Sequence, residues 1–233
     1  MERKVEFKSG ENILRGTVFI PNGNNSPFPG VILFHGSGSR AETFYKAAPL
    51  LQKEGILAFV FNFTGCGISA GDFSKERVKD GIEDARKGIE AFLSFPELDT
   101  SRRGICGGSY GGFLAALLAE EYSFTSLMLM APSAYSREGL EMTHDVADDK
   151  RGNFYESDSY DAISKFTGDL LVVFHELDTV VPKEMVEEYV KKTQKARLKE
   201  KFVLKGAPHS LKQDIKAQDA GIAKIAEWFK KTL

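Results

Sequence analysis

The stretch RGICGGSYGGFLAALLAEE, residues 103–121, decides the fold of this chain of 233 residues. Residues 103–106 suit a short strand, and residues 113–121 suit a helix of small and apolar residues that packs on a sheet. Between them, residues 107–111 fit the pattern G-x-S-x-G, a sharp turn from strand to helix that leaves no room for side chains beside the serine. This turn lifts the Ser109 hydroxyl above the end of the strand, at the positive end of the next helix. Ser109 is therefore a candidate nucleophile.

Strand-like and helix-like segments alternate along the rest of the chain. Four continuous apolar runs suit strands buried on both faces of a parallel sheet, at residues 31–34, 56–61, 126–131 and 170–174. Helical patterns lie between and after them, at residues 43–53, 78–95, 184–195 and 212–231. We interpret residues 5–19 as an antiparallel hairpin at one edge of the sheet. The sequence thus predicts an α/β fold, a mostly parallel sheet of about eight strands flanked by helices.

We expect one domain over residues 1–233, with a small cap inserted at about residues 132–166. This stretch separates two strands, is polar and weakly patterned, and is long for a connection within a compact domain. Its residues 138–149 include five acidic side chains and no Lys or Arg, so we expect it to disfavour anionic substrates. The alternative is a solvated surface excursion without a role.

Composition and charge argue against several other classes of protein. The chain is 42% hydrophobic and 27% charged, as globular proteins are, and a net charge of −2 predicts no binding to nucleic acid or membranes. Two cysteines are too few for a disulfide framework or a four-ligand zinc site. No apolar run approaches the roughly 20 residues of a membrane span, and residues 1–16 lack a signal-peptide core. We expect a cytoplasmic protein without a metal site, and leave open whether it forms a homodimer.

A serine that attacks a carbonyl group creates an oxyanion, which needs two hydrogen-bond donors. One should be the backbone N–H of Tyr110, the residue after the nucleophile. The other should come from the loop 35–39, which reads HGSGS and follows the first apolar run. We assign it to the N–H of Ser37, with Gly36 and Gly38 as alternatives.

Four histidines could supply the base that activates the nucleophile. His209 follows the strand-like residues 201–204 and precedes the last helix, at the sheet edge where open α/β folds place their sites. We therefore assign the base to His209. We interpret His35 as a structural ring that holds its loop, His175 as a partly buried strand end, and His144 as a residue of the cap.

The base needs an acid to orient it, and this acid should lie between nucleophile and base in the chain. Asp178 follows the fourth apolar run, on a loop at the same edge of the sheet. Glu176 is the closest alternative on that loop, whereas Asp169 precedes the strand and would lie at its opposite end. The predicted triad is Ser109, His209 and Asp178.

These residues resemble the α/β-hydrolase superfamily, whose serine, acid and histidine follow one another in this order. The resemblance runs from about residue 5 to the end of the chain and rests on His35-Gly36, the turn 107–111, Asp178 with Val181-Pro182, and His209. The chain is most similar to small capped bacterial esterases such as cinnamoyl and feruloyl esterases. It also resembles dienelactone hydrolases and the catalytic domain of prolyl-oligopeptidase-type peptidases. Dienelactone hydrolases carry a cysteine where this chain has Ser109, and many relatives have glycine where it has Glu176.

The resemblance implies a cofactor-independent serine hydrolase, and we expect it to act on small-molecule carboxylic esters. Peptidase, thioesterase or lipase activity on the same triad is the alternative, because a fold does not fix the substrate. A hydrolase-derived ligand receptor without catalysis is a third hypothesis. The glycine-rich stretch 65–71 departs from the dinucleotide pattern G-x-G-x-x-G, because its third glycine comes one residue late. We therefore expect no cofactor.

Overall fold

One sheet of eight strands organises the protein, in the order β1-β2-β4-β3-β5-β6-β7-β8. The computed structural model describes the chain except for residues 24–25 and 150–152. From β4 to β8, neighbouring strands are parallel, whereas β1 and β2 form an antiparallel hairpin at one edge and β2 pairs antiparallel with β4. The predicted α/β fold is confirmed. The strands are β1 Glu2–Ser9, β2 Asn12–Phe19, β3 Phe28–Phe34, β4 Leu57–Asn62, β5 Leu98–Gly108, β6 Ser126–Met130, β7 Asp169–His175 and β8 Leu198–Leu204.

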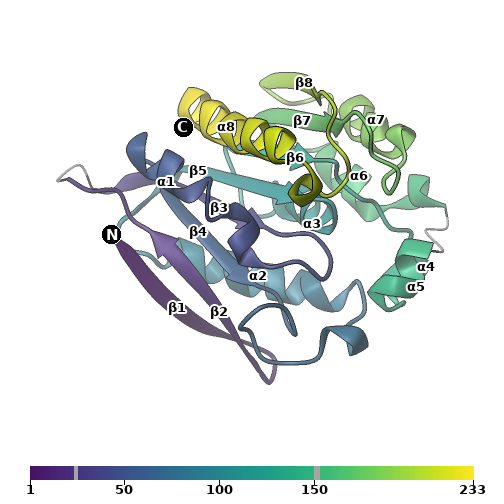
Figure 1. Ribbon diagram of the computed structural model, residues 1–233, viewed down its shortest axis with the longest axis horizontal. Coiled ribbons are helices and arrows are strands. Elements are labelled where there is room, and N and C mark those ends of the chain that lie inside the picture. The colour runs from purple at the N-terminus through teal and green to yellow at the C-terminus, as the bar shows by residue number, and fades with distance from the viewer. Residues whose placement is uncertain (24–25, 150–152) are drawn as a thin grey trace.

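Helices cover both faces of the sheet (Figure 1). On one face lie α1 (Ala48–Lys53) and α8 (Ile215–Thr232). On the other lie α2 (Asp80–Leu93), α3 (Tyr110–Leu118) and α7 (Lys183–Lys192). Each central strand therefore has apolar side chains on both faces, which explains why the apolar runs in the sequence are continuous rather than alternating.

The predicted helix 43–53 is interrupted in the structure. Residues Ala41–Phe44 form a 3₁₀ turn, η1, and α1 begins only at Ala48. Pro49 lies in the first turn of α1. Proline has no N–H and its ring collides with the turn before it, so it is tolerated at a helix start and not inside a helix. The proline therefore sets the start of α1.

The predicted helix 212–231 is divided in a similar way. Leu211–Gln213 form a 3₁₀ turn, η4, before α8. The side chain of Asp214 accepts a hydrogen bond of 2.9 Å from the N–H of Ala217. An aspartate in this position caps a helix, because it satisfies an N–H that has no partner within the helix. Asp214 therefore fixes the first residue of α8.

The segment 132–166 contains short helices. They are α4 (Arg137–Leu140), α5 (His144–Asp149), a 3₁₀ turn η3 (Phe154–Glu156) and α6 (Asp158–Ile163). Its residues 150–152 lie outside the described part of the chain. Helix α6 packs against α3 and α7, while α4 and α5 lie at the side of the molecule in Figure 1. The segment is thus structured where it is described, and its role as a cap stays a prediction.

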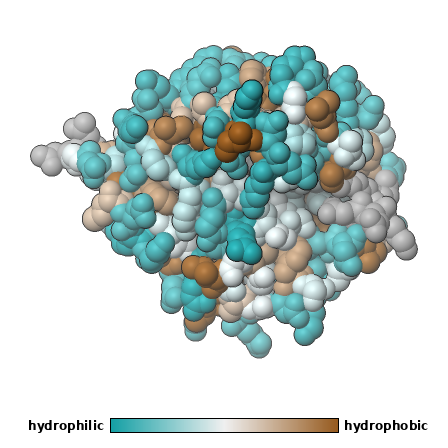
Figure 2. Space-filling view, viewed as in Figure 1, coloured by the Kyte–Doolittle hydropathy of each residue, from teal (hydrophilic) through white to brown (hydrophobic). Residues whose placement is uncertain are grey.

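Hydrophobic residues on the surface seen in Figure 2 form small separate groups between hydrophilic ones. Among the described residues, no helix combines the length and the apolar character that crossing a bilayer requires.

Candidate active site

The candidate nucleophile lies on a strained turn between β5 and α3. Ser109 has φ 52° and ψ −118°, a conformation that costs a non-glycine residue about 1–3 kcal/mol. Its N–H donates to the carbonyl oxygen of Met130 at 2.9 Å, and its own carbonyl accepts from the N–H of Ser133 at 3.0 Å. A side chain at Gly111 would overlap the carbonyl oxygen of Phe34. Strands on both sides of β5 therefore hold the turn in its strained form.

The structure brings the three residues of the predicted triad into one hydrogen-bonded chain. His209 Nε2 lies 3.1 Å from Ser109 Oγ, and His209 Nδ1 lies 2.7 Å from Asp178 Oδ2. A carboxylate accepts, so Nδ1 carries the proton and Nε2 is left as the acceptor for the serine hydroxyl. This arrangement can withdraw a proton from Ser109 during an attack on a carbonyl carbon.

Asp178 is held as a carboxylate. Burial raises its pKa, but the hydrogen bond from His209 and those from the N–H groups of Val181 and Val180 outweigh burial, so the pKa lies below its ordinary value. The two backbone bonds to Asp178 Oδ1 measure 2.9 Å from Val181 and 2.8 Å from Val180. The acid therefore has a fixed position and a negative charge at neutral pH.

The loops that carry acid and base are tied to each other. Asp178 follows β7, His209 follows β8, and the N–H of Leu177 donates to the carbonyl of Ala207 at 2.9 Å. His175 Nδ1 lies 3.0 Å from the carbonyl oxygen of Pro208 and 3.2 Å from that of His209. The imidazole of His175 therefore donates to the backbone beside the candidate base.

The two alternative acids are engaged elsewhere. The carboxylate of Glu176 accepts from Lys205 Nζ at 2.7 Å and from the N–H of Gly206 at 2.8 Å. Asp169 is the first residue of β7 and pairs with Arg197, with Nε to Oδ1 at 2.8 Å. Within the described chain, Asp178 is the carboxylate that contacts His209.

A cavity of about 310 Å³ opens beside the nucleophile. Ser37 lines it, as expected for a loop that supplies an oxyanion donor. A Cβ placed on Gly36 would lie 3.4 Å from the Cβ of Ser109, so this loop lies directly against the nucleophile. Tyr110 is the first residue of α3, where a backbone N–H has no partner in the first turn of the helix. The cavity is lined by His35, Gly36, Ser37, Ser39, Thr43, Phe44, Gly108, Ser109, Met130, Ala131, His175, Val180, His209, Ser210, Leu211 and Lys212.

The cavity wall carries a positive charge. Lys212 is the one Lys, Arg, Asp or Glu among the described residues that line it, and no described carboxylate lies in ion-pair distance of its ammonium. None of the described residues of segment 132–166 lines the cavity. The side chains of Asp148 and Asp149 lie outside the described part. The expectation that acidic residues of this segment disfavour anionic substrates therefore gains no support from the cavity wall.

Ser133 is a residue that sequence reasoning missed. Its Oγ lies 3.3 Å from Ser109 Oγ, and only 1% of the residue is exposed. Its carbonyl accepts from the hydroxyl of Tyr189 at 2.6 Å. The contact arises because the chain turns back after β6, with Ala131 at φ 41°. No motif in the sequence indicated this turn.

His35 and His144 lie outside the hydrogen-bonded chain. The buried His35 ring lies between its own loop and Phe63, 2.8 Å from the carbonyl oxygen of Gly36 and 3.2 Å from the N–H of Phe63. This geometry agrees with a structural role. His144 is buried, stacked on Phe73 at a ring distance of 4.7 Å. The described residues hold no cluster of His, Cys, Asp and Glu that could bind a metal ion.

Comparisons with known proteins identify the family and the fold of the chain. Residues 25–152 match the sequence model of the family described as serine aminopeptidase, S33. No curated protein matches the chain by sequence at a significant level. The esterase Pf2001 from Pyrococcus furiosus has a similar structure, with a TM-score of 0.71, 24% identity, and coverage of 100% of this chain and 93% of that one.

Two further solved structures share the fold. Est1E from Butyrivibrio proteoclasticus, described with ferulic acid bound, has a TM-score of 0.74 and 18% identity, and covers 97% of this chain and 96% of that one. A monoacylglycerol lipase from Paleococcus ferrophilus has a TM-score of 0.70 and 18% identity, with coverage of 94% and 99%.

Proposed function

The chain belongs to the serine aminopeptidase S33 family of α/β-hydrolases. We propose that it hydrolyses carboxylic esters through an acyl-enzyme on Ser109. The observation that carries the proposal is the chain of hydrogen bonds from Ser109 Oγ through the His209 ring to Asp178, at 3.1 and 2.7 Å, beside a cavity. A hydroxyl, an imidazole and a carboxylate in this order are the parts of an activated nucleophile.

The first half of the reaction forms the acyl-enzyme. Ser109 Oγ attacks the ester carbonyl while its proton passes to His209 Nε2, and the negative charge on Asp178 stabilises the resulting imidazolium. The N–H groups of Tyr110 and Ser37 hold the oxygen that becomes an anion. When the tetrahedral intermediate collapses, the bond to the alcohol oxygen breaks, and this oxygen takes the proton from His209.

The second half releases the acid. His209 removes a proton from water, and the hydroxide attacks the acyl carbon to form a second tetrahedral intermediate with its oxygen on the same two N–H groups. Collapse of this intermediate breaks the bond to Ser109 Oγ, which takes the proton back from His209. The enzyme returns to its starting state, and no group outside the protein is consumed except water.

The charge of the cavity favours esters over the free amino termini of peptides. An aminopeptidase must bind a substrate ammonium group, for which a carboxylate is the natural partner. Lys212 instead places a positive charge in the wall. Because the family is described as serine aminopeptidase, aminopeptidase activity is the second candidate function. A cavity of about 310 Å³ is at the small end of ligand sites, so we expect short acyl chains or a single aromatic ring to fit best.

Steady-state hydrolysis of p-nitrophenyl esters from acetate to palmitate, and of a feruloyl ester, tests the proposal. An alanine p-nitroanilide tests the aminopeptidase, and Ser109→Ala is the control for both. We expect turnover of short esters that depends on Ser109, and at least tenfold lower kcat/KM on the anilide. Turnover of the anilide alone would contradict the ester proposal in favour of the second candidate, and equal ester turnover by Ser109→Ala would contradict both.

A further inference from the structure

The side chain of Tyr110 leads away from the cavity. Its phenol donates a hydrogen bond of 2.6 Å to the carbonyl oxygen of Val78, and both residues are buried. A side chain at Gly81 would overlap the phenol oxygen, so α2 has a glycine where the phenol fits. Burial raises the pKa of Tyr110 well above its ordinary value, so the phenol stays a donor. The hydroxyl end of the Tyr110 side chain is therefore held in a fixed position.

The anchor point on Val78 is also bound to the segment 132–166. The N–H of Val78 donates to the carbonyl of Met142 at 3.0 Å, and the N–H of Lys79 donates to that of Leu140 at 3.0 Å. We call residues 140–143 the strap. Backbone hydrogen bonds on a buried residue have a defined geometry, so Val78 connects the strap on one side with Tyr110 on the other.

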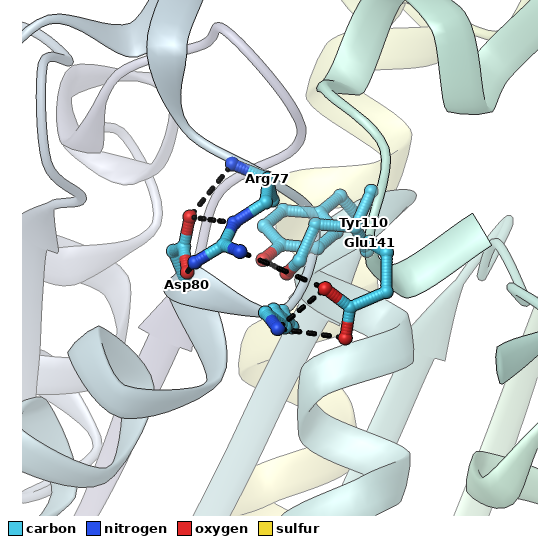
Figure 3. Close-up of polar contacts among 6 residues, drawn as sticks. Arg77, Asp80, Tyr110 and Glu141 are labelled. Carbon is cyan, nitrogen blue, oxygen red and sulfur yellow. Dashed lines mark hydrogen bonds and ion pairs between the residues drawn. The ribbon is translucent and has the colours of Figure 1, made fainter. Parts of the chain in front are cut away.

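Ion pairs also join the strap to the residues on either side of Val78 (Figure 3). Glu141 of the strap lies 2.7 Å from Lys79 Nζ and 3.6 Å from Arg77, and Arg77 pairs with Asp80 at 2.9 Å. These side chains are partly exposed to solvent, and ion pairs at the surface contribute about 0–1 kcal/mol. The buried phenol and the backbone bonds of the strap therefore carry most of the connection.

We propose that Tyr110 is a positioning residue, whose phenol couples the strap to the direction of its own backbone N–H in the oxyanion hole. The proposal rests on the proposed function. The peptide bond between Ser109 and Tyr110 carries that N–H, and Ser109 stores strain at φ 52°. Rotation of this peptide changes ψ of Ser109 from −118°, and at a ψ of about +47° the residue would reach the less strained left-handed helical region with the N–H turned away from the oxyanion. The phenol bond resists this rotation from the side of Tyr110, and the strap holds the acceptor Val78 in place.

The first test removes the hydroxyl with Tyr110→Phe. The matched control is Tyr160→Phe, which also removes a buried phenol bonded to a carbonyl, that of Met185 at 2.9 Å, but lies on α6 rather than at the start of α3. Loss of a whole oxyanion donor costs about 10²–10³ in kcat, so we expect a misdirected one to cost about tenfold. We expect kcat of Tyr110→Phe to fall about tenfold with KM unchanged, and Tyr160→Phe to keep kcat within about twofold.

A second readout separates positioning from general loosening. A trifluoromethyl ketone forms a tetrahedral adduct with serine whose oxygen occupies the oxyanion hole, so its affinity includes the hydrogen bonds of that site. We expect its inhibition constant to rise about tenfold in Tyr110→Phe and to stay unchanged in Tyr160→Phe, while both variants lose similar thermal stability.

The strap is tested at Lys79. Its φ of −68° suits proline, so Lys79→Pro deletes the N–H bonded to Leu140. Lys79→Ala keeps this N–H and removes the ion pair with Glu141. We expect Lys79→Pro to lower kcat and ketone affinity by about threefold and Lys79→Ala to change neither. In the double variant of Lys79→Pro and Tyr110→Phe, the fold decrease in kcat should be smaller than the product of the two single decreases, because both substitutions act through Val78.

The outcomes separate this proposal from the proposed function. Ester turnover that depends on Ser109, with kcat of Tyr110→Phe equal to wild type, would overturn the coupling and leave the hydrolase intact. Equal losses in Tyr110→Phe and Tyr160→Phe, or in Lys79→Pro and Lys79→Ala, would also overturn it. A wild-type protein without turnover that depends on Ser109 would overturn both proposals.

Discussion

Acid should destabilise this protein through His35, a residue outside the candidate triad. The ring is 1% exposed. Because Nδ1 lies 2.8 Å from the carbonyl oxygen of Gly36, it carries the proton, and Nε2 accepts the N–H of Phe63 at 3.2 Å. A second proton would have to enter at Nε2, where it would face that N–H. Burial, together with the nearby Lys212 charge, outweighs the Gly36 hydrogen bond and lowers the pKa of His35 to about 4.

The sign and size of the effect follow from proton linkage. Below pH 6.5, His35 binds a proton in the unfolded chain but stays neutral in the folded protein. The free energy of unfolding therefore falls as the pH falls towards 4. At about 1.4 kcal/mol per pKa unit, the full loss is about 3 kcal/mol, of which about 2 kcal/mol appear between pH 7 and pH 5. Against a typical total stability of 5–15 kcal/mol, this change is readily measured.

The assay is urea denaturation of wild type and His35→Gln at pH 7, 6 and 5. The single tryptophan, Trp228, is buried in the core and reports unfolding by fluorescence. A glutamine oxygen can replace Nε2 as acceptor for Phe63 but does not titrate. We expect His35→Gln to be less stable at pH 7, and to lose about 2 kcal/mol less than wild type between pH 7 and pH 5.

The other titrating groups are present in both proteins. Their contributions therefore cancel when the pH dependence of the unfolding free energy is compared between wild type and His35→Gln. Among these groups is His175, whose pKa is also lowered by burial. Parallel pH dependences of stability in wild type and His35→Gln would contradict this prediction, since His35 would then titrate alike in the folded and unfolded states.

Four further outcomes are expected. Asp178→Asn should lower kcat about 10⁴-fold without unfolding, since the base loses its orienting acid; a loss under tenfold would reassign the acid. Ser133→Ala should slow fluorophosphonate labelling about threefold to tenfold, through one lost hydrogen bond of 0.5–1.5 kcal/mol; an unchanged labelling rate would refute a role beside the nucleophile. Gly65→Ala should cost about 2 kcal/mol or more in urea unfolding, because φ is +68° and a Cβ would overlap the N–H of Phe73. Lys212→Gln should lower kcat/KM for the anionic p-nitrophenyl hemisuccinate about fivefold relative to kcat/KM for p-nitrophenyl butyrate, because the attraction of an exposed ammonium for the anionic ester contributes about 1 kcal/mol. An equal fall for both esters would assign Lys212 a packing role.

Local patterns were enough to predict the sheet and the three residues of the candidate triad. The continuous apolar runs correspond to β3, β4, β6 and β7, since each of these strands is covered on both faces. Parallel strands bring their carboxyl ends to one edge, so loops after different strands meet there. That rule predicted the meeting of Ser109, Asp178 and His209 from positions far apart in the chain.

Contacts that depend on the exact path of the chain could not be predicted. Ser133 reaches the nucleophile because Ala131 adopts a positive φ, which its residue type does not suggest. Lys212 resembles any other exposed lysine in the sequence, and only its 3₁₀ turn places it at the cavity. The hydrogen bond from the Tyr110 phenol to the carbonyl of Val78 joins two residues that lie 32 positions apart in the sequence. Each of these depends on tertiary packing rather than on periodicity or motif.

The proposed role of Ser109 as nucleophile is tested most directly by labelling of the wild-type protein with a fluorophosphonate, followed by intact-mass measurement and peptide mapping. This reagent reacts preferentially with a serine that a base has activated. We expect one label per chain, on Ser109, formed more slowly in the presence of a short p-nitrophenyl ester and absent in Ser109→Ala and His209→Ala. A wild-type protein that stays unlabelled, or a label on another residue, would contradict this role.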